Sequence, residues 1–151
     1  MKLTLTLPNI IALYDALRTL DGYEQVIEGR AVRVPFMFGA ANFKVARNLN
    51  KLAPFVTSFN EARNKLIMEL SNGAPSIDIS TDPSAARRYM QASAQWETMT
   101  EELDLIPLTE DELNLRINPI TPGVLAVLDA AGLIIPETDE AQSPRPTLVR
   151  G

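Results

Sequence analysis

Histidine and cysteine are both absent from this sequence of 151 residues. Their absence excludes a thiolate nucleophile, an imidazole base, disulfides and metal sites built on Cys or His ligands. The sequence also has no Gly-rich phosphate loop, no serine nucleophile elbow and no apolar run of roughly 18 residues. We therefore expect a protein that is not an enzyme, that uses no cofactor and that does not enter a membrane.

The start of the sequence does not have the pattern of a secretory signal peptide. A single Lys2 is followed by alternating Leu and Thr and then by Pro8, with no long apolar segment. The composition, 46% hydrophobic and 22% charged, is typical of a soluble globular protein. We expect one globular domain over residues 1–136 and a polar, proline-containing tail over residues 137–151.

Charge is divided unevenly along the chain, whose net charge is −5. Residues 1–75 carry +3, whereas residues 76–151 carry −8. One interpretation is an ordinary solvated surface, and the other is a bipolar surface that pairs with a second copy or with another protein. The acidic total argues against nucleic-acid binding, where a basic surface dominates affinity.

The first third of the sequence predicts a strand, a helix and a hairpin. Residues 2–7 alternate Leu and Thr, which predicts a strand with one buried face. Pro8 then opens a helix with an apolar stripe from Ile10 to Leu20, and Gly22 ends it. Residues 23–34 favour a small hairpin around Glu28 and Gly29, with a single irregular strand as the alternative.

Two amphipathic helices dominate the middle of the sequence. Residues 38–70 carry apolar side chains at helical spacing, and Pro54 should kink or split this helix. Residues 76–80 predict a short strand or an extended connector. Asp82 and Pro83 begin the second helix. Its stripe is expected to face the core and to pack antiparallel to the first helix; the stripe comprises Tyr89, Ala92, Trp96, Met99 and Leu103.

Two short elements are expected near the C-terminus. Thr109 and Glu112 have the spacing of a helix capping box, but residues 113–117 alternate, so that a strand there is equally compatible. Thr121 and Pro122 begin a small helix that Gly132 closes. The predicted fold class is α+β: an antiparallel pair of long helices, two to five short strands and a small C-terminal helix.

Several charged groups are candidates for a chemical site. The best metal candidate is an acidic set that a solvated surface and a favourable helix start also explain; it comprises Glu101, Glu102, Asp104, Glu110, Asp111 and Glu112. Asp78 and Asp82 are a weak carboxylate pair. Arg87 and Arg88 lie near a helix start that could hold phosphate, with surface ion pairing as the alternative. We assign no metal site and no catalytic residue.

Two clusters are candidates for contact with a protein partner. Phe36, Met37 and Phe38 are three large apolar residues in succession before a helix. They can pack inside the protein or anchor a partner. Lys44, Arg47 and Lys51 form a basic stripe that is either a solvated helix face or a contact for an acidic partner.

The layout resembles small uncharacterised proteins of tailed bacteriophages and prophages. The resemblance rests on residues 3–5 leading to residues 9–14, on Leu17 and Leu20, on Lys44 and 47–48 in a long helix, on residues 61–63, and on Leu125 with Leu128. Residues 36–39 and the proline-rich tail depart from that pattern. The resemblance implies a bacterial host's cytoplasm or a virion as the location, and it carries over no functional residues.

The sequence therefore predicts a non-enzymatic interaction or assembly protein, such as a virion-associated component, that forms an oligomer or part of a larger assembly. Its partner would be a second copy or another protein. A small regulator that binds and inhibits a host protein through the acidic half is the alternative. A carboxylate-dependent metal enzyme is the third hypothesis.

Overall fold

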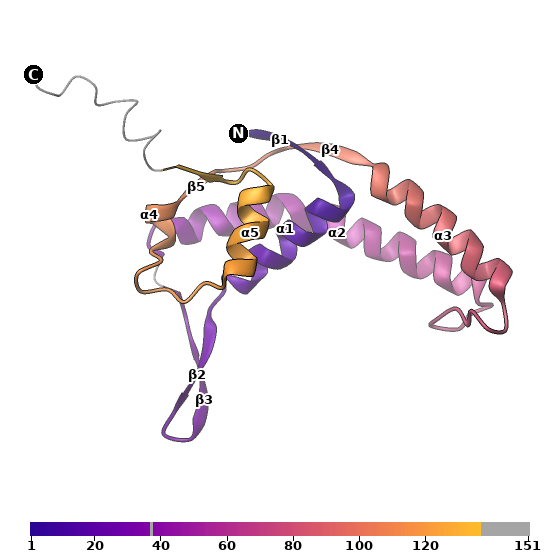
Figure 1. Cartoon of the computed structure of the whole chain (residues 1–151), viewed down its shortest axis with the longest axis horizontal. Coiled ribbons are helices and arrows are strands. Elements are labelled where there is room, and N and C mark those ends of the chain that lie inside the picture. The colour runs from indigo at the N-terminus through magenta and orange to yellow at the C-terminus, as the bar shows by residue number, and fades with distance from the viewer. Residues whose placement is uncertain (37, 137–151) are drawn as a thin grey trace, which may run out of the picture.

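The computed structural model describes residues 1–36 and 38–136. It is an α+β fold in which helices dominate (Figure 1). The helices are α1 Leu7–Thr19, α2 Ala41–Leu70, α3 Pro83–Thr98, α4 Glu110–Leu113 and α5 Pro122–Ala130. The strands are β1 Lys2–Thr6, β2 Tyr23–Ile27, β3 Arg30–Val34, β4 Thr100–Asp104, β5 Leu108–Thr109 and β6 Ile134–Ile135. The described part thus has six strands, one more than the range predicted.

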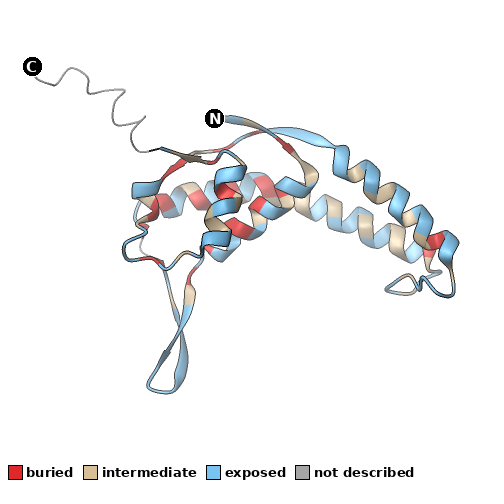
Figure 2. Cartoon of the chain, viewed as in Figure 1, coloured by how far each residue is buried: buried red, intermediate tan, exposed pale blue. Residues whose placement is uncertain are grey.

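The hydrophobic core lies where α1 packs against the first half of α2 on one side and against α5 on another (Figure 1). The stripe of α1 is buried as its spacing predicts, because Thr6 caps the helix and Pro8 lies at its first turn. The fully buried side chains come from α1, α2, the β4–β5 segment and the C-terminal elements; they include Ile10, Leu13, Leu17, Leu52, Leu105, Leu108, Leu113, Leu128 and Leu133. Figure 2 shows that burial is concentrated in this body.

The second half of α2 leaves the body and forms an arm with α3, which runs back antiparallel beside it (Figure 1). We call this pair the α2–α3 arm. The helix is continuous through Pro54, so the predicted split is wrong. A proline removes one backbone hydrogen bond, and the bonds of the neighbouring turns hold the rest of the helix together. Near the end of the arm only Leu70 and Ala85 are buried.

The strands form three separate pairs. β1 pairs antiparallel with β4, with Leu3 opposite Leu103. β5 and β6 form a parallel pair of two residues each. β2 and β3 form the predicted hairpin, with Tyr23 opposite Val34 and Glu24 opposite Arg33. The strand β4 was not predicted: α3 ends at Thr98, so the apolar stripe expected to run on to Leu103 crosses into an extended segment.

The shorter elements resolve the alternatives that the sequence left open. Residues 76–80 contain no strand and form a connector. At α4 the capping box is complete, because Thr109 and Glu112 each bond the backbone of the other. The chain then turns at Asn114, whose φ of 53° is left-handed, so the alternation over residues 113–117 does not produce a strand. Thr121 caps α5 as predicted.

Candidate interaction surfaces

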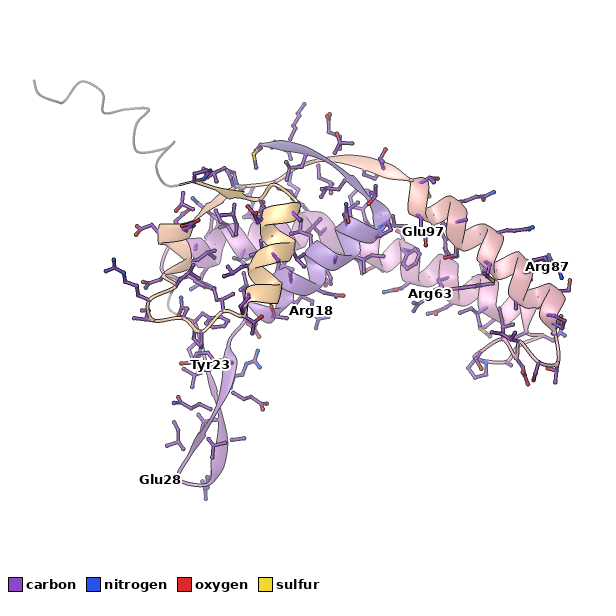
Figure 3. The ribbon with its side chains drawn as sticks, viewed as in Figure 1. Arg18, Tyr23, Glu28, Arg63, Arg87 and Glu97 are labelled. Carbon is purple, nitrogen blue, oxygen red and sulfur yellow. The ribbon has the colours of Figure 1, made fainter. Side chains whose placement is uncertain are left out.

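The β2–β3 hairpin projects from the body as a two-stranded ribbon (Figure 1). Its turn consists of Glu28 and Gly29, whose φ values of 52° and 77° are those of a type I′ turn. Figure 3 shows Tyr23 at the root of the hairpin and Glu28 at its tip. Tyr23 and Val34 are partly buried, and every residue between them is exposed. Val26 is 74% exposed, and Ile27 and Val32 are exposed too, so apolar side chains face solvent on both strands.

Aromatic stacking joins the root of the hairpin to the body. The ring centroids of Tyr23 and Phe36 are 5.4 Å apart, and those of Phe36 and Phe38 are 5.3 Å apart. Phe36 and Phe38 are only 9% and 6% exposed, which places both in the core. The prediction that they anchor a partner does not fit this placement, because packing within the chain already covers their rings. Met37 lies outside the described residues.

An open cavity of about 870 Å³ lies beside the hairpin root. The end of α1, the end of β3 and the first turns of α2 line it; among the lining residues are Arg18, Asp21, Arg33, Phe36, Asn42 and Leu49. Opposite charges face it, and Arg33 lies 3.7 Å from Asp21 in a solvent-exposed ion pair. A cavity with such mixed walls offers no concentrated charge for a small ion. It is a recess beside the hairpin in which a partner side chain could lodge.

The predicted basic stripe on α2 is divided among different contacts. The ammonium of Lys44 lies 2.5 Å from a carboxylate oxygen of Glu112, and both side chains are partly buried. Burial raises the pKa of Glu112, but hydrogen bonds from Lys44 and Thr109, together with the Lys44 charge, outweigh it and lower the pKa overall. Lys44 therefore joins α2 to the start of α4, and the structure gives it a structural role within the chain.

The other two members of the stripe are exposed. The guanidinium of Arg47 lies 5.6 Å from the centre of the Phe43 ring, one helical turn earlier. Phe43 is 64% exposed. Its ring and the Arg47 guanidinium together form an amphipathic surface patch on α2 that no pattern in the sequence indicated. Lys51 lines a small cavity of about 210 Å³ together with Arg47 and Asp104. A role for Arg47 and Lys51 in partner contact stays a prediction.

The α2–α3 arm is held together by a small aromatic cluster. Trp96 meets Phe59 edge-on at 5.2 Å and Tyr89 at 6.2 Å between ring centres. Trp96 is only partly buried, and it lines a cavity of about 290 Å³ between the arm and the start of α1. Trp96 was expected to lie in the core, but it is only partly buried, because two helices alone cannot enclose so large a ring. Met68, Ile79 and Met90 are exposed on the arm and its connector.

Asp78 and Asp82 serve local structure. Asp82 accepts the Ala85 amide as the cap of α3, and Asp78 bonds Ser80. These hydrogen bonds lower the pKa of Asp78. Within residues 1–36 and 38–136, no three acidic side chains gather as a metal site would require. Arg87 and Arg88 are both exposed on α3.

None of the helices in the described part of the chain combines the length and the apolar character needed to cross a bilayer. Comparisons with family models, curated proteins and solved structures found no match to this chain.

Proposed function

We propose that this chain is a non-enzymatic interaction protein that assembles with other protein chains, as a structural or assembly component of a phage particle does. The observation that carries the proposal is the shape of the molecule. The hairpin and the α2–α3 arm both extend beyond the core and are largely exposed (Figure 2). Both carry apolar side chains that face solvent. Apolar groups on projecting elements are typical of surfaces that become buried in a complex.

The hairpin supports this proposal most directly. A two-stranded ribbon without a third strand or a covering helix has marginal stability in water. Residues 24–33 are all exposed, so the ribbon receives no packing from the body beyond its root. A partner chain would supply the missing packing. The charge division of the sequence supports the same proposal, because opposite charges on one molecule favour oriented association.

Sedimentation velocity of the full chain over a wide range of concentrations tests the proposal. We expect species heavier than the 16.6 kDa monomer. Two double variants then locate the contact: Val26→Ser with Val32→Ser on the hairpin, and Met68→Ser with Met90→Ser on the arm. At least one of them should reduce the association, because each removes exposed apolar surface.

A matched control introduces two serines on the arm without removing a large apolar side chain. Thr57 on α2 and Ala94 on α3 are both exposed. Thr57→Ser with Ala94→Ser should therefore leave the mass distribution unchanged.

A monomer at every concentration would contradict self-assembly. If such a monomer bound one host protein in a defined complex, the host-directed regulator would replace the assembly component. A melting temperature that rises with Mg²⁺ or Ca²⁺, and no longer does so in Glu110→Gln with Glu112→Gln, would instead support a carboxylate metal site.

A further inference from the structure

The hairpin carries opposite charges on its two strands. Residues 21–28 hold Asp21, Glu24 and Glu28 and no basic residue, whereas residues 29–34 hold Arg30 and Arg33 and no acidic one. Glu24 and Glu28 therefore belong to β2 and its turn, with Asp21 just before β2, and the basic residues belong to β3. In the described part of the chain β2 and β3 pair only with each other, so each has one open edge.

The open edges present backbone groups that can bond another strand. In a hairpin with a two-residue loop, the residue pair beside the loop is hydrogen-bonded, and bonded pairs alternate with non-bonded pairs along the ribbon. Ile27 and Arg30 flank the loop, so Val26 with Ala31 is a non-bonded pair. The backbone amides of such pairs point outward. The amide of Val26 therefore faces the open edge of β2, and that of Ala31 faces the open edge of β3.

We infer that the hairpin pairs with the hairpins of further copies of this chain, the β3 edge of one copy lying against the β2 edge of the next. The inference rests on the proposed assembly function and names its contact surface. Each acidic strand then lies between two basic strands, and Glu24 of one copy faces Arg33 of the next, as these residues do within one hairpin. A strand of another protein that carries one sign of charge would complement only one of the two edges. A second copy of this chain complements the charge of both edges.

Geometry supports a repeating contact. β2 and β3 are antiparallel. Copies related by a rotation about an axis parallel to the strands therefore place β3 of one copy antiparallel to β2 of the next. Such a head-to-tail contact uses two different edges, so it repeats and closes into a ring where the rotation allows it. The exposed Val26, Ile27 and Val32 would then lie in a continuous sheet, where they contact side chains of the neighbouring strands.

A pair of single-cysteine variants tests which edges meet, because the natural sequence has no cysteine to interfere. In the inferred register Gln25 of one copy faces Val32 of the next as a non-bonded pair, whose side chains approach closely enough for a disulfide. Gln25→Cys and Val32→Cys each leave the hairpin charges intact. After mixing and treatment with a mild thiol oxidant, we expect a cross-linked dimer that contains one copy of each variant.

Neither cysteine variant alone should cross-link to the same extent as the mixture. A dimer formed readily by Gln25→Cys alone would show a two-fold contact between β2 strands and overturn the head-to-tail arrangement.

A charge exchange tests the role of the opposite signs. The double variant Glu24→Arg with Arg33→Glu keeps opposite charges within each hairpin. Asp21→Asn is added to both the exchanged and the unexchanged protein, so that the existing ion pair between Arg33 and Asp21 is absent from both. The exchanged protein should associate with itself at least tenfold more tightly than with the unexchanged protein, because mixed contacts place like charges together. Equal association of mixed and matched proteins would overturn the inference.

A proline variant separates this inference from the proposed function. Val26→Pro removes one outward amide, whereas Val26→Thr keeps the amide and the branched side chain. Circular dichroism and melting confirm that both variants fold. If Val26→Pro lowers the mass by sedimentation and Val26→Thr does not, the edge contact is supported. If both keep the mass of the natural protein, assembly stands and the hairpin contact fails. If the natural protein is itself monomeric, self-assembly and the hairpin contact both fail.

Discussion

Asn48 in α2 forms two hydrogen bonds with the backbone of Ile106, which is 58 residues away in the sequence. Its side-chain amide donates to the Ile106 carbonyl at 2.9 Å, and its side-chain oxygen accepts the Ile106 amide at 2.8 Å. The side chain of Asn48 is fully buried. It therefore pairs with the segment between β4 and β5 as a neighbouring strand would, and it holds that segment on the body.

Asn48→Ala should destabilise the fold by about 2–4 kcal/mol, because both backbone groups of Ile106 lose their partner in a partly buried site. Asn48→Asp should be at least as harmful at neutral pH, since a carboxylate cannot donate to the Ile106 carbonyl. Chemical denaturation measures the change. Asn50→Ala, an exposed asparagine on the same helix, is the control and should cost less than about 0.5 kcal/mol. Equal losses at the two positions would contradict the pairing.

The Lys44–Glu112 contact should make stability depend on pH. The pKa of Glu112 in the folded state is below its ordinary value of 4.5. Stability from this contact is therefore fully present above about pH 4.5 and is lost as pH falls through the lowered pKa. Glu112→Gln keeps the capping oxygen but removes the charge, so it should cost about 1 kcal/mol at pH 7 and less in acid.

Melting curves from pH 7 down to strongly acidic conditions provide the measurement for Glu112→Gln. Glu110→Gln, in the same first turn of α4 and exposed, is the matched control for the general benefit of a negative charge at a helix start. A difference between the natural protein and Glu112→Gln that did not narrow on acidification would show that the Lys44 ion pair is not its cause.

Trp96→Ala should cost about 1–3 kcal/mol, below the roughly 3–5 kcal/mol that removal of a fully buried large aromatic side chain produces. The partial exposure of Trp96 is the reason, since part of the residue already contacts solvent. Leu52→Ala, in the fully buried core, should cost about 2–5 kcal/mol and serves as the reference. Circular dichroism can follow both variants, whereas Trp96→Ala removes the only tryptophan that fluorescence could report. A loss from Trp96→Ala larger than that from Leu52→Ala would contradict the placement of Trp96 on the arm.

Gly22→Ala should be more harmful than Gly29→Ala, although both glycines belong to the hairpin region. A Cβ at Gly22 would lie 2.8 Å from the Val34 carbonyl oxygen, and φ there is 145°. A Cβ at Gly29 meets nothing within 4 Å, so only the strain of its φ of 77° remains. We expect a loss of about 1 kcal/mol at Gly29 and about 2–3 kcal/mol at Gly22, measured by thermal melting. The reverse order would contradict the close approach at the hairpin root.

Much of the local structure could be predicted from short stretches of sequence. Thr109 with Glu112, Asp82 with Pro83, and Thr121 with Pro122 begin helices where the structure has them. The type I′ turn at Glu28 and Gly29 lies at the centre of the predicted hairpin. These features depend on hydrogen bonds and backbone angles within a few residues, and that is the range over which a sequence pattern acts.

The tertiary structure alone decided which surfaces are covered. The run of Phe36, Met37 and Phe38 could not reveal that Phe36 and Phe38 turn into the core, nor could the helical spacing of Lys44 show that it reaches Glu112. The partner of Asn48 and the pairing of β4 with β1 likewise join residues far apart in the chain. Local propensities determine where helices and turns begin and end, but burial depends on which distant segments meet, because contact with solvent is a property of the whole packed molecule.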